Sequence, residues 1–284
     1  MTGSGSAGRR WCWSQADGTF AAVPPDGPVD VIDSWLVSDG RVVALDAHLD
    51  RFTTACATLF AVPREHTSAF LRAAVRRIPA RGRWFPRMEL TVRDGGPAFH
   101  LRLRAAPPRG AAVRVWVHDG ADQRRHPSVK GPDLDWLAQV RSAAQRRGAD
   151  EALLLSADGR LVEGSTTSVL WWRGDTLYAP DADRLDLLPS VTRTAVLRIA
   201  AAHRTRVAYA CPRPEDLAGL ETWAVNALHG IRPVREWVGS STVAGPAPRA
   251  RTWQTRLDAL AADRSEEPAT DRSREPVIDK PATR

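Results

Sequence analysis

The stretch DEALLLSADGRLVEGSTTSVLWW, residues 150–172, carries the strongest structural signal in the chain. Its apolar side chains form two runs of strand length, and Asp158-Gly159 between them is a pair typical of hairpin turns. Glu163 interrupts the second run. A buried carboxylate is costly unless a cation or a hydrogen-bond donor meets it. We therefore expect either that Glu163 lies in water at a strand end or that a positive group lies beside it.

The residues before 126 alternate between strand-like and helix-like spacing of apolar side chains. Asp39-Gly40 marks a second hairpin turn, and Asp46 is the predicted cap of the helix that follows. The expected elements are hairpins over 10–23 and 31–45, helices over 46–60 and 67–78, and strands over 84–94, 98–106 and 111–118.

The second half of the chain continues the alternation. The stretch over 187–204 is expected to be a loop running into a helix, with Ser190 or Thr192 near the start of the helix. The other expected elements are a helix over 133–148, the hairpin in 150–172, strands over 176–180, 206–213 and 221–228, and a turn with a strand over 229–237.

Shifts in composition divide the chain into segments. The Pro- and Gly-containing PPRG at 107–110 and the polar DGADQRRHPS at 119–128 mark the best candidate for a connection between domains. We expect a disordered N-terminus over 1–10, a small N-terminal domain over 11–116, an interdomain linker over 117–125, a large domain over 126–262 and a disordered tail over 263–284.

Bulk properties exclude several classes of protein. The 284 residues contain no apolar run long enough for a membrane span and no signal-like N-terminus, and the three cysteines form no metal-ligand or disulfide pattern. These features predict a cytoplasmic protein without a metal site or a membrane partner. The net charge of +7 could suit nucleic acid, but the basic residues are dispersed and accompany no nucleic-acid-binding motif.

The kind of basic residue is more informative than the number. Of the 40 lysines and arginines, only Lys130 and Lys280 are lysines, and Lys280 lies in the predicted tail. Arginine replaces lysine in most surface roles but cannot form a Schiff base, which needs an amine that loses its proton. Lys130 is therefore either a lysine retained by chance in an arginine-rich chain or a reactive amine.

Four features in a fixed order resemble the fold-type IV pyridoxal-phosphate enzymes, the class of branched-chain and D-amino-acid transaminases and of aminodeoxychorismate lyase. They are Lys130, EGSTTSVLWW from Glu163, LLPSVTRTAVL over 187–197 and VNALHGIRPV over 225–234. The resemblance covers about residues 30–240 and implies a two-domain α/β (α+β) fold. Its smaller N-terminal domain is α/β, and its larger C-terminal domain is β-barrel-like with helices.

The resemblance also implies a role for the two residues singled out above. The lysine matching Lys130 carries pyridoxal 5'-phosphate as a Schiff base and later acts as the proton shuttle. The glutamate matching Glu163 faces the pyridine nitrogen and keeps it protonated, which makes the ring an electron sink. On this interpretation the positive group beside Glu163 is the cofactor.

Further residues match the family's cofactor site. Four of them also have an ordinary structural explanation: Arg51 as an exposed helix residue, Thr192 as a helix cap, and Ser165 and Thr166 as partners for backbone groups. The resemblance implies that helix-start amides and an arginine hold the phosphate. The candidate cofactor-binding residues are Arg51, Lys130, Glu163, Ser165, Thr166, Val191, Thr192, Asn226 and Ala227.

Substrate contacts are less well marked. Arg87 and Arg93 could hold a substrate carboxylate, although surface charge explains them as well. His229 lies in the NALHGIRPV segment and is a third candidate, whereas His48 and His126 are discounted as acid–base groups. The segment PDGPVDVIDSW, where relatives usually carry a glycine-containing GDG, leaves the shape of the substrate pocket open.

The resemblance implies an enzyme that is a homodimer and acts on an amino-acid-like small molecule. The NAL start of 226–234 favours 4-amino-4-deoxychorismate lyase, which eliminates pyruvate and gives p-aminobenzoate. The transaminases of the branched-chain type often have a tyrosine five residues after the lysine, where this chain has Asp135. A branched-chain or D-amino-acid transaminase is the alternative. A non-catalytic relative that binds a small anion is a further alternative.

Overall fold

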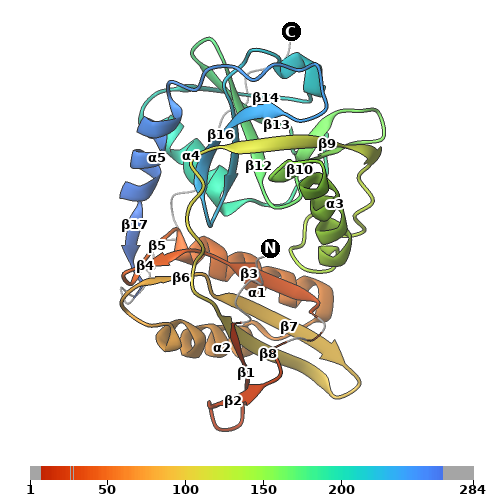
Figure 1. Cartoon of the computed structure of the whole chain (residues 1–284). Coiled ribbons are helices and arrows are strands. Elements are labelled where there is room, and N and C mark those ends of the chain that lie inside the picture. Colours follow the sequence, from red (N-terminus) through yellow and green to blue (C-terminus); the bar gives the residue numbers. More distant parts are fainter. Residues whose placement is uncertain (1–7, 26, 28, 265–284) are drawn as a thin grey trace.

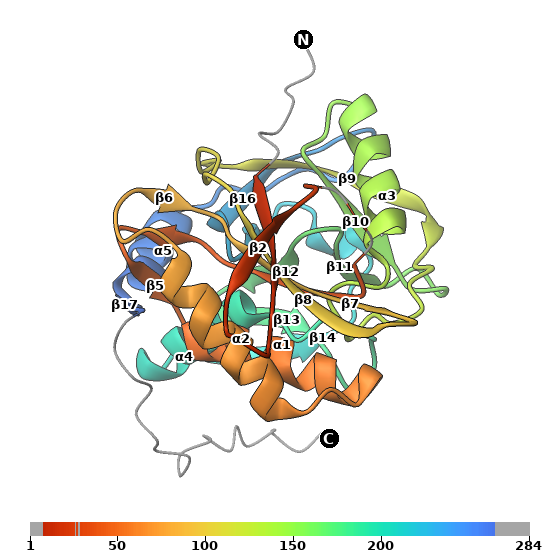
Figure 2. The same cartoon turned by 90° about the horizontal axis from the view of Figure 1, so that it is seen from below.

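The computed structural model describes residues 8–25, 27 and 29–264 (Figure 1). The first half forms an antiparallel five-stranded sheet in the order β2-β1-β8-β7-β3. Its elements are β1 (Arg9–Trp13), β2 (Phe20–Val23), β3 (Val31–Ser34), β7 (Arg87–Arg93), β8 (Gly96–Leu103), and the helices α1 (Leu45–Phe60) and α2 (Arg64–Arg77). Figure 2 shows the two helices lying across this sheet.

Alternation along these strands gives the small sheet one apolar and one polar face. Met88 and Leu90 of β7 pack with Phe52 of α1 and Phe70 of α2 in one buried cluster. Arg87 and Glu89 alternate with them, so they lie on the opposite face of the sheet. This polar face contributes to the site described below.

The second half forms an eight-stranded curled sheet in the order β11-β10-β9-β16-β15-β12-β13-β14. Pairings β10–β9, β16–β9 and β13–β14 are parallel, and the others are antiparallel. The strands are β9 (Val113–Ala121), β10 (Glu151–Leu155), β11 (Leu161–Gly164), β12 (Ser168–Arg173), β13 (Thr176–Pro180), β14 (Arg206–Ala210), β15 (Thr222–Asn226) and β16 (Gly230–Trp237).

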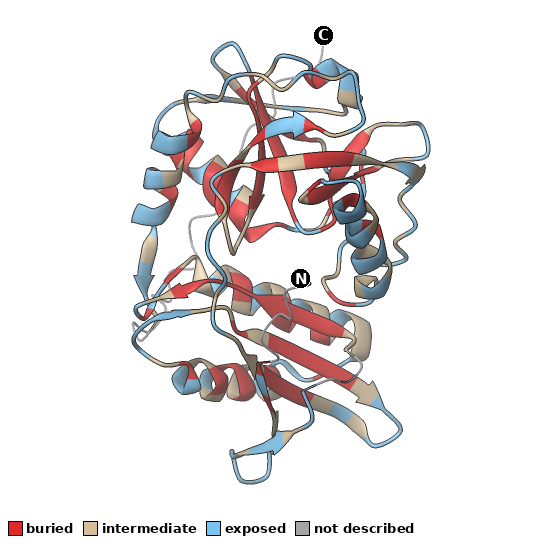
Figure 3. Cartoon of the chain, in the orientation of Figure 1, coloured by how far each residue is buried: buried red, intermediate tan, exposed pale blue. Residues whose placement is uncertain are grey.

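Helices cover the outer faces of the large sheet, and their own outer faces are exposed (Figure 3). They are α3 (Leu134–Arg146), α4 (Val191–Ala202) and α5 (Ala250–Ala259); a short 3-10 helix, η1, spans Pro214–Leu217. Trp171 belongs to a buried cluster made mainly of strand residues, whereas its neighbour Trp172 packs with Trp253 of α5. None of the described helices is long and apolar enough to cross a membrane.

A third sheet joins the two halves of the chain. Its order is β17-β5-β4-β6, with β4 (Val37–Ser38), β5 (Arg41–Val43), β6 (Arg83–Trp84) and β17 (Ala261–Asp263). The sequence pattern predicted neither α5 nor β17. Asp263 of β17 pairs with Arg41, so the predicted tail over 263–284 begins in a strand. Residues 265–284 lie outside the described residues, as do 1–7 of the predicted disordered N-terminus, whereas β1 begins at Arg9.

The opening stretch differs from the expected hairpin in one respect. β10 and β11 do pair around the Asp158-Gly159 turn, with Leu155 opposite Leu161. The second apolar run, however, is two strands, because the chain turns where the Gly164 N–H donates to the Thr167 carbonyl at 2.7 Å. β12 after this turn pairs with β13 and β15 instead of β10.

Two other expectations are wrong in detail. Residues 117–121 of the predicted linker belong to β9, which pairs with β10 and β16, so this part is sheet. The connection between the small and large sheets lies before Val113 instead. The N-cap of helix α1 is Ala44, which makes no side-chain hydrogen bond, so Asp46 is not the cap. Asp46 lies in the first turn instead, where the helix dipole stabilises a carboxylate.

Candidate active site

A cavity of about 460 Å³ opens between the small sheet and the large sheet and is lined by residues from both halves of the chain. This volume suits a small-molecule site. The structure brings all nine predicted cofactor-binding residues to its wall: Arg51, Lys130, Glu163, Ser165, Thr166, Val191, Thr192, Asn226 and Ala227. Of the substrate candidates, Arg87 and His229 line the cavity. Arg93 does not; it is half exposed and pairs with Asp30 at 2.9 Å.

Lys130 lies in a turn just before α3, close to β3. Its carbonyl accepts a hydrogen bond from the Ile32 N–H at 2.7 Å. Gly131 makes this approach possible, because a Cβ there would come within 2.3 Å of the Asp30 carbonyl oxygen. The backbone of Lys130 is thereby held at the junction of the two halves.

The surroundings of Lys130 favour a neutral amine. Burial, followed by the charge of Arg51, lowers the pKa of Lys130, against the opposing effect of Asp33, Glu163 and Glu151. A lowered pKa increases the fraction of the nucleophilic, unprotonated form at neutral pH.

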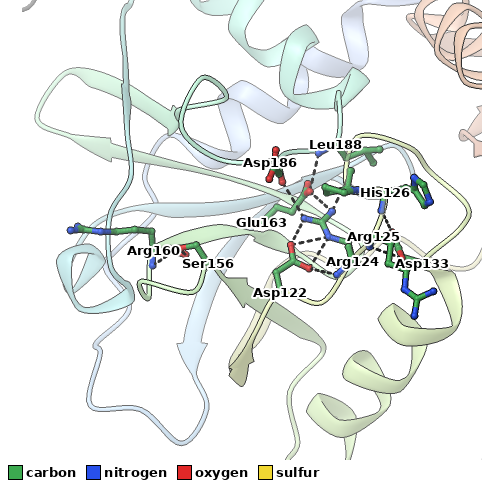
Figure 4. Close-up of polar contacts among 11 residues, drawn as sticks. Asp122, Arg124, Arg125, His126, Asp133, Ser156, Arg160, Glu163, Asp186 and Leu188 are labelled. Atoms are coloured by element: carbon green, nitrogen blue, oxygen red, sulfur yellow. Dashed lines mark hydrogen bonds and ion pairs between the residues drawn. The ribbon is translucent and has the colours of Figure 1, made fainter. Parts of the chain in front are cut away.

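Glu163 is buried near the end of β11 and does meet a positive group (Figure 4). Its Oε1 accepts a hydrogen bond from Arg124 Nη1 at 2.6 Å and another from the Leu188 N–H at 3.0 Å. Burial raises the pKa of Glu163, and Arg124 and the Leu188 N–H oppose this shift. Among the described residues, Oε2 has no hydrogen-bond partner, so this oxygen is free for a further donor.

Arg124 is a site residue that the sequence did not single out. It donates to Asp122 at 2.6 Å as well as to Glu163, and to the Asp186 carbonyl at 3.3 Å (Figure 4). Burial alone would lower the pKa of Arg124, but the two carboxylates raise it, so the guanidinium is charged. Arg124 lies in the polar segment over 119–128, which the sequence pattern predicted to be part of a connection between domains.

Arg51 of α1 is held rigidly at another part of the wall. It donates from Nε and Nη2 to the two oxygens of Asp33, at 2.8 and 2.9 Å, and from Nη1 to the Pro189 carbonyl at 2.9 Å. Asp33 also contacts His48 Nδ1 at 2.8 Å. A guanidinium has five N–H donors, so two remain for an anion in the cavity.

The N-terminus of α4 lies beside Arg51. Ser190 is the N-cap, since its Oγ accepts a hydrogen bond from the Arg193 N–H at 3.2 Å. Thr192 is therefore not the cap. The amides of Val191 and Thr192 lie in the first turn, where backbone N–H groups lack partners within the helix and attract anions.

The remaining predicted residues are held by local hydrogen bonds. The hydroxyls of Ser165 and Thr166 both donate to Glu151, a fully buried carboxylate that the sequence did not reveal as a site residue. Asn226 accepts hydrogen bonds from the N–H groups of Leu228 and His229 and donates to the Thr166 carbonyl at 3.2 Å. Ala227 lies next to Asn226 in the same wall.

The small sheet contributes basic groups to the opposite wall. Arg87 pairs with the buried Glu89 at 2.6 Å, and Glu89 is also held by Arg10 at 2.7 Å. Arg104 lines the cavity close to them, and burial, together with Arg87 and Arg102, lowers the pKa of Arg104 to about 10. This wall can hold a carboxylate by paired hydrogen bonds.

Comparisons with known proteins agree with this geometry. Residues 30–237 match the family described as amino-transferase class IV. A probable branched-chain-amino-acid aminotransferase from Rickettsia felis is 38% identical over 125 residues, which cover 41% of this chain and 42% of that protein. A bifunctional aminodeoxychorismate lyase / D-amino acid transaminase from Mycobacterium tuberculosis is 26% identical, over 74% of this chain and 81% of that protein.

Solved structures share the fold. A hypothetical aminotransferase from Mycobacterium tuberculosis in its apo form has a TM-score of 0.73 at 23% identity, covering 89% of this chain and 98% of that one. A branched-chain aminotransferase from Thermoproteus uzoniensis has a TM-score of 0.75 at 17% identity, covering 88% and 93%. The chain therefore belongs to the class IV aminotransferases, a family of pyridoxal-phosphate enzymes.

Proposed function

We propose that the cavity binds pyridoxal 5'-phosphate and that the chain acts on the amino group of an amino-acid-like substrate. The observation that carries this proposal is the convergence of Lys130, the free Oε2 of Glu163 and the Arg51–α4 corner on one cavity. When bound, the cofactor supplies a carbonyl for amines and a ring that accepts electrons. The wall offers an amine for the carbonyl, an acid for the ring nitrogen and an anion site for the phosphate.

Each residue then has a defined task. Lys130 would hold the carbonyl of the cofactor through Nζ, and the same atom, when free, would take the substrate's α-proton. Glu163 holds a proton at the pyridine nitrogen through Oε2, while Arg124 and Leu188 keep its other oxygen in place. The spare donors of Arg51 and the α4 amides hold the phosphate, and Asn226 and Ala227 complete that wall.

Arg87 is our candidate for the substrate's α-carboxylate. Glu89 holds it from behind, and its side chain lines the cavity. Arg93, on the same strand, lies outside the cavity, and we do not propose a role for it. Ser165 and Thr166, which Glu151 holds in place, line the edge of the cofactor.

The lyase reaction remains our first proposal for the outcome. The lyase reaction is supported by the NAL segment and by the bifunctional Mycobacterium tuberculosis relative, which matches this chain over most of the length of both proteins. Amino transfer is the second candidate, supported by the Rickettsia felis relative and by the second activity of the bifunctional one. The two outcomes differ in where Lys130 delivers the proton and in whether a pyruvate unit leaves.

One experiment separates the outcomes. Cofactor-loaded protein is incubated in one mixture with aminodeoxychorismate. Two other mixtures contain branched-chain L-amino acids or D-amino acids, each with a 2-oxo acid as amino acceptor. We expect pyruvate and p-aminobenzoate from the first mixture, and neither product with Lys130→Ala. Amino transfer without pyruvate release would support the second candidate. No turnover in any mixture, in a folded protein that still binds phosphate, would leave a non-catalytic anion-binding relative.

We also propose a cytoplasmic homodimer. The compartment is supported by three free cysteines, Cys12, Cys56 and Cys211, which suit a reducing environment. The homodimer is supported only by the family resemblance and is tested by light scattering of the purified protein. A monomer that turns over substrate would contradict it.

A further inference from the structure

A groove at the surface of the second half of the chain is separate from the cavity described above. Its volume is about 750 Å³, and of the described residues that line it, none also lines the cavity. Three segments form it: the turn between β12 and β13, the connection between α4 and β14, and the start of α5. We call it the Arg204 groove. Its charged lining residues are Asp175, Arg204, Arg206, Arg249 and Arg256.

Positive charge exceeds negative charge in the Arg204 groove. Among the described residues that line it, Asp175 is the one carboxylate, and it pairs with Arg249 at 3.1 Å. In the part of the chain that the structure describes, no carboxylate lies within ion-pair distance of Arg204, Arg206 or Arg256. Three guanidiniums therefore line the groove without a counter-charge from the protein, and their combined potential attracts anions.

Two buried tryptophans line the groove beneath its arginines. Arg249 lies over the ring of Trp172 at 4.6 Å, and Arg256 over the ring of Trp253 at 5.4 Å. Cation–π attraction holds both guanidiniums against these rings. Trp172 Nε1 is buried and has no hydrogen-bond partner among the described residues. A buried N–H normally meets an acceptor, so this donor also favours an acceptor group in the groove.

The start of α5 adds backbone donors to the same wall. The N-cap of α5 is Arg249, which makes no side-chain capping hydrogen bond, and the helix begins at Ala250. The N–H groups of the first turn lack partners within the helix, and the positive end of the helix dipole attracts anions. Pro248 and Thr252, on either side of this start, line the groove. Guanidiniums beside a helix N-terminus are the donors that bind phosphate groups.

The backbone of Arg204 favours a different residue. Arg204 follows the end of α4 with a φ of 53°, in the left-handed region, and the Thr205 N–H donates to the Ala200 carbonyl at 2.9 Å. Glycine is the usual residue at such a helix end, because any side chain costs conformational energy there. The turn alone therefore favours glycine, whereas the groove uses the arginine side chain.

We propose that the Arg204 groove binds the diphosphate group of a small phosphorylated molecule, at a site separate from the cavity. Guanidiniums bind phosphate oxygens in pairs, and three of them without counter-charge suit two adjacent phosphates better than one. Val191 and Thr192 at the start of α4 line the cavity, whereas Arg204 follows its end. The 12 residues of α4 separate the two sites by about 18 Å, so the groove does not share the donors of the Arg51–α4 corner.

The test is a calorimetric titration of cofactor-loaded protein with inorganic diphosphate, so that the cofactor occupies the Arg51–α4 corner. We expect saturable binding to one site per chain and weaker binding of orthophosphate, which offers fewer acceptor oxygens. A parallel titration with ADP distinguishes the source of the group. ADP that binds as tightly as diphosphate indicates a nucleotide ligand, and ADP that binds more weakly indicates free diphosphate.

Two variants locate the site. Arg204→Gly and Arg206→Gln should each weaken diphosphate binding about fivefold, since each removes one partly exposed charge-assisted contact. Glycine adopts the backbone of residue 204 without strain, so Arg204→Gly should not lower the melting temperature. Arg251→Gln is the matched control, because Arg251 is an exposed residue of α5 that does not line the groove. It should bind diphosphate as wild type does.

Three results would overturn the proposal. The first is wild-type protein that shows no saturable binding of diphosphate, even where it binds a single-stranded DNA oligonucleotide, because the surface would then serve nucleic acid. The second is unchanged binding in both Arg204→Gly and Arg206→Gln. The third is an equal loss in Arg251→Gln, since the anion would then respond only to the overall charge of a basic protein. The proposal does not depend on the proposed function, because the variants locate the site outside the cavity.

Discussion

Asp33 and Glu163 are two buried carboxylates, and each meets an arginine that lines the cavity, yet they are held differently. Both oxygens of Asp33 accept hydrogen bonds from Arg51, and Oδ1 also meets His48 and the Ser34 N–H. In Glu163, Oε1 takes both donors, from Arg124 and Leu188, and Oε2 takes none within the described part of the chain. Both oxygens of Asp33 thus have donors, whereas Oε2 of Glu163 can still accept a hydrogen bond.

The pKa shifts follow this difference. Burial alone would raise the pKa of Asp33, but Arg51 and His48 outweigh it and hold the pKa well below 3.8. For Glu163 burial prevails, and its pKa is raised. Asp33 is thus a permanent anion that positions Arg51, whereas Glu163 can share a proton with a ligand. A saturated carboxylate supports the fold, and a half-saturated one is available for chemistry.

The largest effect on stability should come from Asp33→Asn. The change leaves Arg51 without its buried counter-charge, so the free energy of unfolding should fall by about 3–5 kcal/mol, measured by urea denaturation. Asp50→Asn on the exposed side of α1 is the control, because its pair with Arg64 is 3.7 Å long and largely exposed. Similar losses in both variants would contradict a special role for Asp33.

The pH dependence of stability tests the same residue. Because the folded pKa of Asp33 is lowered, its contribution is complete above the ordinary value of 3.8 and is lost as the pH falls below it toward the folded pKa. Wild type should therefore lose its advantage over Asp33→Asn in acid, as measured by unfolding at a series of pH values. A gap between the two proteins that stays constant down to the acid limit would contradict this assignment.

Glu163→Gln should affect activity more than stability. The neutral amide cannot hold a proton on the pyridine nitrogen, so kcat should fall by about 100-fold, while Arg124 keeps Asp122 as its partner. The measurement is kcat with cofactor-loaded protein on the substrate that it turns over. Glu221→Gln, at a buried glutamate outside the cavity, should leave kcat unchanged. A Glu163→Gln enzyme with wild-type kcat would remove this residue from the chemistry.

The smallest expected effect is that of Ser190→Ala. Loss of the cap on α4 should lower the free energy of unfolding by about 1 kcal/mol, measured by thermal denaturation. Ser190→Thr should restore most of it, because threonine also caps helices. A Thr variant as unstable as the Ala variant would show that the cap is not the source of the effect.

The sequence predicted the parts of the site that lie in recognisable runs. Lys130 stood out by its rarity, and Glu163 by interrupting an apolar strand. Asp33 interrupts the strand VIDSW in the same way, and the same argument could have found it. Arg124 carried no such signal, because it is one of many arginines and lies in a polar segment that read as a linker.

The fold shows the same limit. Strands with strong alternation were predicted, and the family resemblance implied the architecture. The separation of β11 from β12 depends on the turn at 164–167, and the pairing of β17 with β5 joins residues far apart in the chain. Contacts of this kind are decided by packing between distant segments and leave little mark on local pattern.

The central claim is that Lys130 holds the cofactor. The protein is loaded with pyridoxal 5'-phosphate, reduced with borohydride and digested, and the modified peptide is identified by mass spectrometry. The chain has only two lysines, so Lys280 is an internal control. We predict stoichiometric modification at Lys130 and none at Lys280. Modification at Lys280 alone, or no modification in folded protein, would contradict the account.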